Sequence, residues 1–82
     1  MVKVEYDDAF KRVISKIKDN LMIERIEKLI LRIKDNPEIG KPMMHGRRGS
    51  REVYLPPFRL SYAYNKLIDT IIILDFYHKD EQ

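Results

Sequence analysis

Hydrophobic and polar residues follow two different periods along this 82-residue chain. Residues 1–6 alternate with period two, which predicts a short half-buried strand. Apolar residues then recur at three- and four-residue spacing over Ala9–Ile17 and again over Met22–Ile33, which predicts two amphipathic helices. Asp19-Asn20 interrupts the pattern between them, and Asn36-Pro37 ends it because proline disfavours helical backbone in the residue before it. So short a connection predicts an antiparallel helical hairpin.

The second half of the chain returns to period two. The stretch Gly40–Ser50 contains all three glycines and is predicted to be a loop. Arg51–Leu55 is predicted as a short strand, Phe58–Asn65 alternates apolar and polar residues, and the β-branched run Thr70–Tyr77 predicts a central strand. The order β-α-α-β-β-β makes one α+β domain over the whole chain, an antiparallel sheet with the helical hairpin packed on one face.

Composition narrows the class of protein. The chain has no cysteine, which excludes disulfides and thiolate metal sites, and its two histidines are far apart in sequence, so we expect no metal and no cofactor. The longest apolar run, Ile71–Leu74, is far shorter than the ~20 residues that a membrane-spanning helix needs. No basic-then-apolar signal segment opens the chain. These features predict a cytoplasmic protein with no membrane partner.

The net charge of +3 is unevenly distributed. Between positions 41 and 59 there is one acid, Glu52, against five basic residues, namely Lys41, Arg47, Arg48, Arg51 and Arg59. A basic patch of this kind attracts anionic partners. The alternative interpretation is a solvated loop that binds nothing.

Arg59 is the first candidate for chemistry. Its neighbours Phe58 and Leu60 belong to the face that the helices are predicted to cover, so Arg59 points to the uncovered face. Its planar guanidinium can donate two parallel charge-assisted hydrogen bonds to a phosphate. A cross-strand ion pair with Glu52 or Asp75 is the alternative interpretation.

Further candidates lie at the ends of predicted strands. Tyr54 comes just before the Pro56-Pro57 turn and can reach the uncovered face with Arg59. His78 and Lys79 follow the last predicted strand. Histidine can act as a general acid or base near neutral pH, and lysine can stabilise the charge of a phosphorane-like transition state. A solvated strand end is the alternative interpretation for this pair.

Three segments together resemble the RelE/ParE toxin superfamily. They are Gly40-Lys41-Pro42-Met43 in the loop, Gly49-Ser50-Arg51-Glu52-Val53 in the next strand and Phe58-Arg59-Leu60-Ser61-Tyr62 in the strand after it. The closing run Ile71–Lys79 resembles the family's last strand, which ends in His-Arg or His-Lys. The resemblance covers essentially the whole chain, including the helical hairpin.

This resemblance implies the toxin of a toxin–antitoxin pair. RelE-type members enter the ribosomal A site and cut mRNA, without a metal, by attack of a ribose 2′-hydroxyl on the adjacent phosphate. The resemblance therefore implies an endoribonuclease whose partners are the ribosome, mRNA and a cognate antitoxin protein. In that interpretation Lys41, Arg47 and Arg48 are the RNA-binding residues.

The resemblance also suggests roles for the candidate catalytic residues. Carried over by position, Arg59 contacts and polarises the phosphate, and Lys79 stabilises the transition state. Glu52 and Tyr54 occupy the places where the best-known RelE proteins have two lysines, and the C-terminal tyrosine of those enzymes has no counterpart here. Proton transfer then falls to one of three residues, Arg51, Tyr54 or His78, and the sequence leaves the choice open.

Two other functions fit the same resemblance. A ParE-like toxin shares the fold and poisons DNA gyrase by protein contact. A catalytically silent member would only bind its antitoxin. The missing lysines and tyrosine keep both alternatives open.

Overall fold

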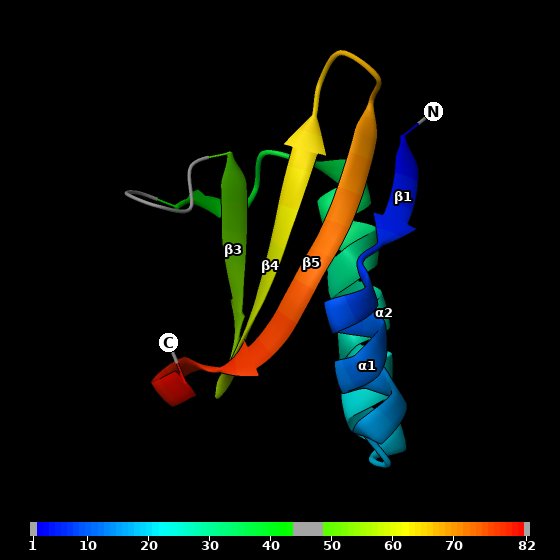
Figure 1. Ribbon diagram of the computed structural model, residues 1–82, viewed down its shortest axis with the longest axis vertical. Helices are drawn as coiled ribbons and strands as arrows, with labels where there is room; N and C mark the ends of the chain where they lie inside the picture. The colour runs from blue at the N-terminus through cyan, green and yellow to red at the C-terminus, as the bar shows by residue number, and fades with distance from the viewer. Residues whose placement is uncertain (1, 44–48, 82) are drawn as a thin grey trace.

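In the part of the chain that the structure describes, two α-helices pack with one five-stranded sheet (Figure 1). The computed structural model describes residues 2–43 and 49–81. The elements are β1 (Lys3–Tyr6), α1 (Asp8–Lys16), α2 (Asn20–Asp35), β2 (Lys41–Pro42), β3 (Ser50–Leu55), β4 (Phe58–Asn65), β5 (Thr70–His78) and a 3₁₀ turn, η2 (Lys79–Glu81). The predicted α+β class and the predicted order of the helices and main strands are confirmed. In the described part of the chain, no helix is long and apolar enough to cross a membrane.

Aspartate side chains begin both helices. The Asp7 carboxylate accepts a hydrogen bond from the Ala9 amide at 3.1 Å, and the Asp19 carboxylate accepts one from the Leu21 amide at 3.0 Å. Each satisfies an amide of the first turn that has no partner within the helix. The second helix ends at Asp35, immediately before the Asn36-Pro37 pair that was predicted to end it.

The sheet has the strand order β1-β5-β4-β3-β2. The pairs β2–β3, β3–β4 and β4–β5 are antiparallel, but β1 pairs with β5 in parallel, so the sheet is mixed rather than wholly antiparallel as predicted. Side-chain alternation shows which face a residue occupies and says nothing about the direction of the neighbouring strand. The two-residue strand β2 lies in the segment that was predicted to be a loop.

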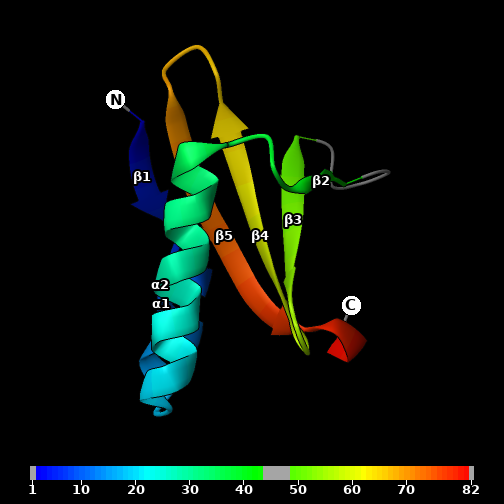
Figure 2. The same cartoon turned by 180° about the vertical axis from the view of Figure 1, so that it is seen from behind.

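Both helices pack on the same face of the sheet, as predicted. Seen from behind, α2 lies in front of the sheet (Figure 2). The buried core joins apolar residues of the helices to apolar residues of β4 and β5; its members are Phe10, Ile26, Leu29, Ile30, Ile33, Leu60, Tyr62, Ile71, Ile73 and Phe76. Among the described residues, no helix packs on the other face of β3, β4 and β5, which is called here the open face.

A β-bulge interrupts the pairing of β4 with β5. Tyr62 lies opposite Ile73, but the preceding residue, Ser61, lies opposite Asp75. Leu74 is therefore an extra residue in β5. An extra residue of this kind bends the strand and shifts the alternation of its side chains.

The bulge decides which side chains of β5 reach the open face. Ile73 before the bulge and Phe76 after it are both buried in the core, although they are three residues apart. Strict alternation would have placed them on opposite faces. As a consequence Tyr77, opposite Arg59 in the register, joins Arg59 on the open face.

Candidate functional site

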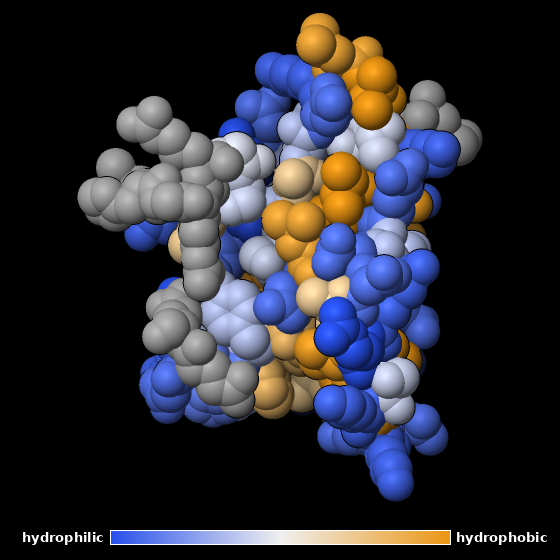
Figure 3. Space-filling view, viewed as in Figure 1, coloured by the Kyte–Doolittle hydropathy of each residue, from blue (hydrophilic) through white to orange (hydrophobic). Residues whose placement is uncertain are grey.

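Polar side chains from three neighbouring strands meet on the open face. Tyr54 of β3 lies opposite Arg59 of β4, and Arg59 lies opposite Tyr77 of β5. Glu52 precedes Tyr54 by two residues on β3 and so shares its face. Figure 3 shows that apolar residues form a strip down the middle of the molecule, beside the more polar surface over β3. The predicted placement of Arg59 and Tyr54 on one face is confirmed.

Glu52 is the centre of this group. Its carboxylate accepts a hydrogen bond from Arg59 Nη1 at 3.1 Å, through Oε1, and another from the Tyr77 hydroxyl, through Oε2. The glutamate side chain is only 9% exposed, whereas that of Arg59 is 34% exposed. The Arg59 guanidinium also lies 5.9 Å from the centre of the Tyr54 ring, within the range of a cation–π contact. Of the two ion pairs considered for Arg59, the structure contains the one with Glu52.

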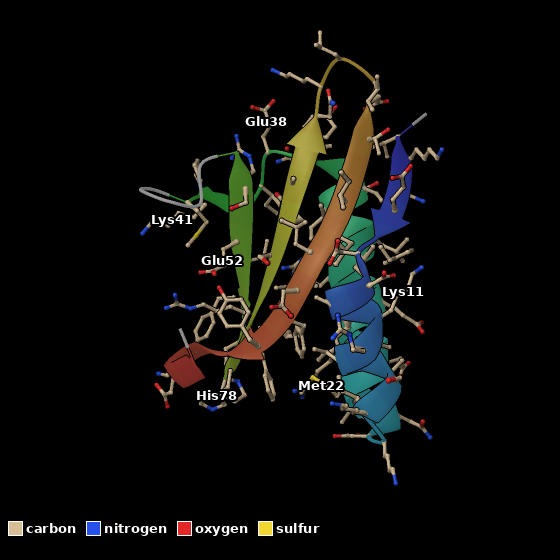
Figure 4. All side chains as sticks on the ribbon, viewed as in Figure 1. Lys11, Met22, Glu38, Lys41, Glu52 and His78 are labelled. Atoms are coloured by element: carbon tan, nitrogen blue, oxygen red, sulfur yellow. The ribbon has the colours of Figure 1, made fainter. Side chains whose placement is uncertain are left out.

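Three of them, Glu52, Tyr54 and Arg59, line an open pocket of about 620 Å³ at the β2 edge of the sheet. Lys41 lies opposite Glu52 in the β2–β3 register and brings a second cation to the pocket. In Figure 4, Glu52 stands on β3 and Lys41 lies beyond it toward the edge of the molecule. The remaining lining residues are mainly apolar, namely Ile39, Pro42, Met43 and Val53. The pocket thus combines two cations, one carboxylate and the aromatic ring of Tyr54, a residue that is 51% exposed.

Arg51 does not belong to this pocket. It pairs with Tyr62 in the β3–β4 register and therefore lies on the helix side of the sheet. Its Nη1 donates to the carbonyl oxygens of Gly40 at 2.8 Å and Glu38 at 3.1 Å, and its Nη2 lies 3.7 Å from the Glu38 carboxylate. The guanidinium holds the segment that leads into β2, which is a structural task.

His78 is also separated from Arg59. It lies opposite Phe58, on the helix side of the sheet, with its ring edge-on to that of Phe58 at 5.6 Å between centroids. Its Nδ1 accepts a hydrogen bond from the Asp80 amide at 3.2 Å. His78 lines a different pocket, of about 400 Å³, together with Met22 at the turn of the helical hairpin (Figure 4).

The remaining predicted candidates are Lys79, Arg47 and Arg48. The backbone of Lys79 lies beside the β3–β4 turn, because its amide donates to the Pro57 carbonyl at 3.1 Å, and its side chain is exposed. Pro57 is two residues along the chain from Arg59. Arg47 and Arg48 lie outside the described residues.

Sequence reasoning did not assign a functional role to Glu52 or Tyr77. Glu52 was considered as an ion-pair partner and as a departure from a family lysine, although its two-residue spacing from Tyr54 already placed both on one face. Tyr77 could not be placed, because the alternation that fits Ile71 and Ile73 would have turned it toward the helices. The extra residue at the bulge has no distinct sequence signal in this β-branched and apolar strand.

Comparison with known proteins assigns the family. The family model for the ParE toxin of type II toxin–antitoxin systems, parDE, matches residues 4–82. The chain belongs to this family. No curated protein matches the sequence.

Solved structures of toxins share the fold. The chain superposes on the intact Escherichia coli RelBE toxin–antitoxin complex with a TM-score of 0.80 at 14% identity, covering 95% of this chain and 96% of that one. For the Mycobacterium tuberculosis RelBE2 complex the TM-score is 0.81 at 20% identity, covering 95% and 98%. For YafQ of E. coli it is 0.73 at 15% identity, covering 99% and 97%. The RelE/ParE resemblance is thus confirmed, and this family member is a toxin of a toxin–antitoxin system.

Proposed function

We propose that this toxin is a metal-independent endoribonuclease that cuts mRNA on the ribosome and is held inactive in the cytoplasm by a cognate antitoxin. One observation carries the proposal: a single pocket on the open face brings together Lys41, Tyr54 and Arg59. All three were candidates from the sequence, and they come from three different strands. Two cations beside an exposed aromatic ring match the chemistry of a nucleotide, which offers a phosphate and a base.

Each group has a part in binding RNA. Arg59 can direct its guanidinium fork at the oxygens of the scissile phosphate. Lys41 supplies a point charge for a neighbouring phosphate. Tyr54 is an exposed residue whose ring offers a surface on which a splayed base can stack, as single-stranded RNA is commonly recognised.

Lys79 is the remaining candidate for transition-state stabilisation. Its backbone is anchored to Pro57, and the exposed lysine side chain is free to extend toward the pocket end that holds Arg59. Arg51 and His78 are not assigned a catalytic step, because both lie on the helix side of the sheet.

The first experiment measures cleavage of a defined mRNA on programmed ribosomes. We expect Arg59→Ala to lower the single-turnover rate roughly 30- to 1000-fold, the equivalent of ~2–4 kcal/mol of transition-state stabilisation. Arg25→Ala, which removes an exposed arginine from α2, is the matched control and should cleave normally. Because Arg59→Ala also leaves Glu52 without its cation, Arg59→Lys is measured in parallel. Lysine keeps the charge but not the two-pronged geometry, and should also be slow.

A ParE-like attack on DNA gyrase by protein contact is the second candidate. The observation in its favour is the ion pair itself, since Glu52 neutralises one of the two cations of the pocket. Gyrase supercoiling and gyrase-linked DNA breaks are therefore assayed with the same protein. Gyrase inhibition without any mRNA cleavage would overturn the proposed function and establish the second one.

A further inference from the structure

The carboxylate in the pocket needs an explanation. Glu52 is nearly buried at the centre of a site proposed to bind phosphate, and it neutralises the very arginine that should hold that phosphate. For binding alone this arrangement is unfavourable, because a carboxylate repels a phosphate group at short range. A positioned carboxylate is useful when the reaction itself requires a proton acceptor.

The surroundings of Glu52 hold its carboxylate in place. Arg59 fixes one oxygen at 3.1 Å and the Tyr77 hydroxyl binds the other. An ionised carboxylate has about four acceptor positions, so two hydrogen bonds leave it able to accept a further proton donor. Because Glu52 also lines the open pocket, a ribose hydroxyl can approach it from solvent.

We propose that Glu52 is the general base of this toxin and takes the proton from the attacking ribose 2′-hydroxyl. This inference rests on the proposed endoribonuclease function. As the proton moves from O2′ to a Glu52 oxygen, the O2′–P bond forms. The P–O5′ bond breaks, and its electron pair leaves with O5′, which takes a proton from solvent water. The products are a 2′,3′-cyclic phosphate and a 5′-hydroxyl, with no oxidant, reductant or metal required for the balance.

The neighbouring groups have supporting parts. Arg59 and Lys41 lie on either side of Glu52 and are cations that can hold the phosphate, and arginine stays protonated throughout. Tyr77 is a positioning residue, since its hydroxyl donates to Glu52 and orients it. Asp75 of β5 is another carboxylate on this side of the sheet, across Ser61 from Glu52, and its Oδ1 accepts a hydrogen bond from the Phe76 amide at 2.8 Å.

The decisive variant is Glu52→Gln, which keeps the shape and the hydrogen-bonding oxygen but removes the base. Single-turnover cleavage of ribosome-bound mRNA should fall roughly 100- to 10,000-fold. Binding is measured with an mRNA that carries 2′-deoxyribose at the cleavage position and cannot react. That binding should stay equal or become tighter, because Arg59 loses its competing carboxylate. Asp75→Asn, which removes a negative charge from the same side, is the matched control and should cleave at the wild-type rate.

A second variant separates proton transfer from a structural role. In Glu52→Ala, added formate or acetate can enter the space left by the side chain and restore cleavage. If the missing group is a base, the rescued rate should be greater with acetate, the stronger base, than with formate. Rescue that is absent, or independent of basicity, would overturn the assignment even if Glu52→Gln failed to fold.

The remaining outcomes distinguish this inference from the function on which it rests. If wild-type toxin cleaves and Glu52→Gln cleaves within threefold of it, Glu52 is not the base although the protein is a ribonuclease. If the wild-type toxin cleaves no mRNA, the endoribonuclease function fails and the base assignment fails with it. A loss of activity in Glu52→Gln that comes with equally weakened binding of the 2′-deoxy substrate would reassign Glu52 to RNA binding.

Discussion

Removing one hydroxyl group, by Tyr62→Phe, should strongly destabilise this small domain. Tyr62 is fully buried, and its hydroxyl makes two hydrogen bonds to the segment between α2 and β2. It donates to the Pro37 carbonyl at 2.8 Å and accepts from the Gly40 amide at 2.9 Å. The packing is close, since a Cβ atom added at Gly40 would lie 2.7 Å from the hydroxyl oxygen. Tyr62 therefore fastens the segment that delivers Lys41 to the pocket.

The size of the effect follows from what phenylalanine leaves behind. Gly40 is buried, so its amide would be deprived of its partner without gaining water, at a cost of about 1–3 kcal/mol. The other hydrogen bond, to the Pro37 carbonyl, is worth roughly 1 kcal/mol net. The two together suggest a decrease of about 2–4 kcal/mol in the free energy of unfolding. For a domain of this size each kcal/mol shifts the Tm by roughly 4–8 °C, so the midpoint should fall by about 8–32 °C.

The measurement is thermal unfolding of the purified toxin, followed by circular dichroism. Tyr64→Phe is the matched control, because the Tyr64 hydroxyl donates to the Asp69 side chain at 2.7 Å at a surface turn, where water can take its place. Its midpoint should move much less than that of Tyr62→Phe. Equal midpoints for Tyr62→Phe and the wild type would show that the hydroxyl does not fasten this segment.

Two further predictions concern pH and salt. Burial raises the pKa of Tyr62 above its ordinary value of 10.0, so above pH 10 the unfolded chain releases the hydroxyl proton before the folded one, and wild-type stability falls as pH rises. The free energy of unfolding, measured by urea titration, should therefore decrease less with alkaline pH in Tyr62→Phe than in the wild type. Equal decreases in the two proteins would contradict the raised pKa of Tyr62. Replacing Arg47 and Arg48 together by Glu should weaken RNA binding. It should also reduce the slope of the logarithm of the RNA-binding constant against the logarithm of the salt concentration, by about 0.7 for each phosphate that the variant no longer neutralises. An unchanged slope would show that these two loop residues bind no RNA.

Most of the fold could be predicted because local patterns determine it. Helical spacing and the capping aspartates define α1 and α2, and alternation defines β4 over Phe58–Asn65 with the bounds that the structure has. The parallel pairing of β1 with β5 could not be predicted, since direction depends on which edge of the sheet is free. Arg59 was placed correctly by the alternation of its strand, and Tyr54 by its position just before the Pro56-Pro57 turn. Tyr77 could not be placed, because alternation fails at Leu74, the bulge residue.

The two faces of the sheet carry different constraints, which explains how so diverse a family keeps one fold. The helix face holds the core, where Leu60, Tyr62 and Phe76 are almost fully buried and any change of volume affects stability. Arg59 and Ser61, which alternate with Leu60 and Tyr62 along β4, point to the open face instead. Structures that share only 14–20% identity with this chain therefore superpose closely on it, while the open face decides the chemistry. In this chain Glu52 puts a carboxylate next to Arg59 on the open face, and in the mechanism proposed above this carboxylate is the proton acceptor.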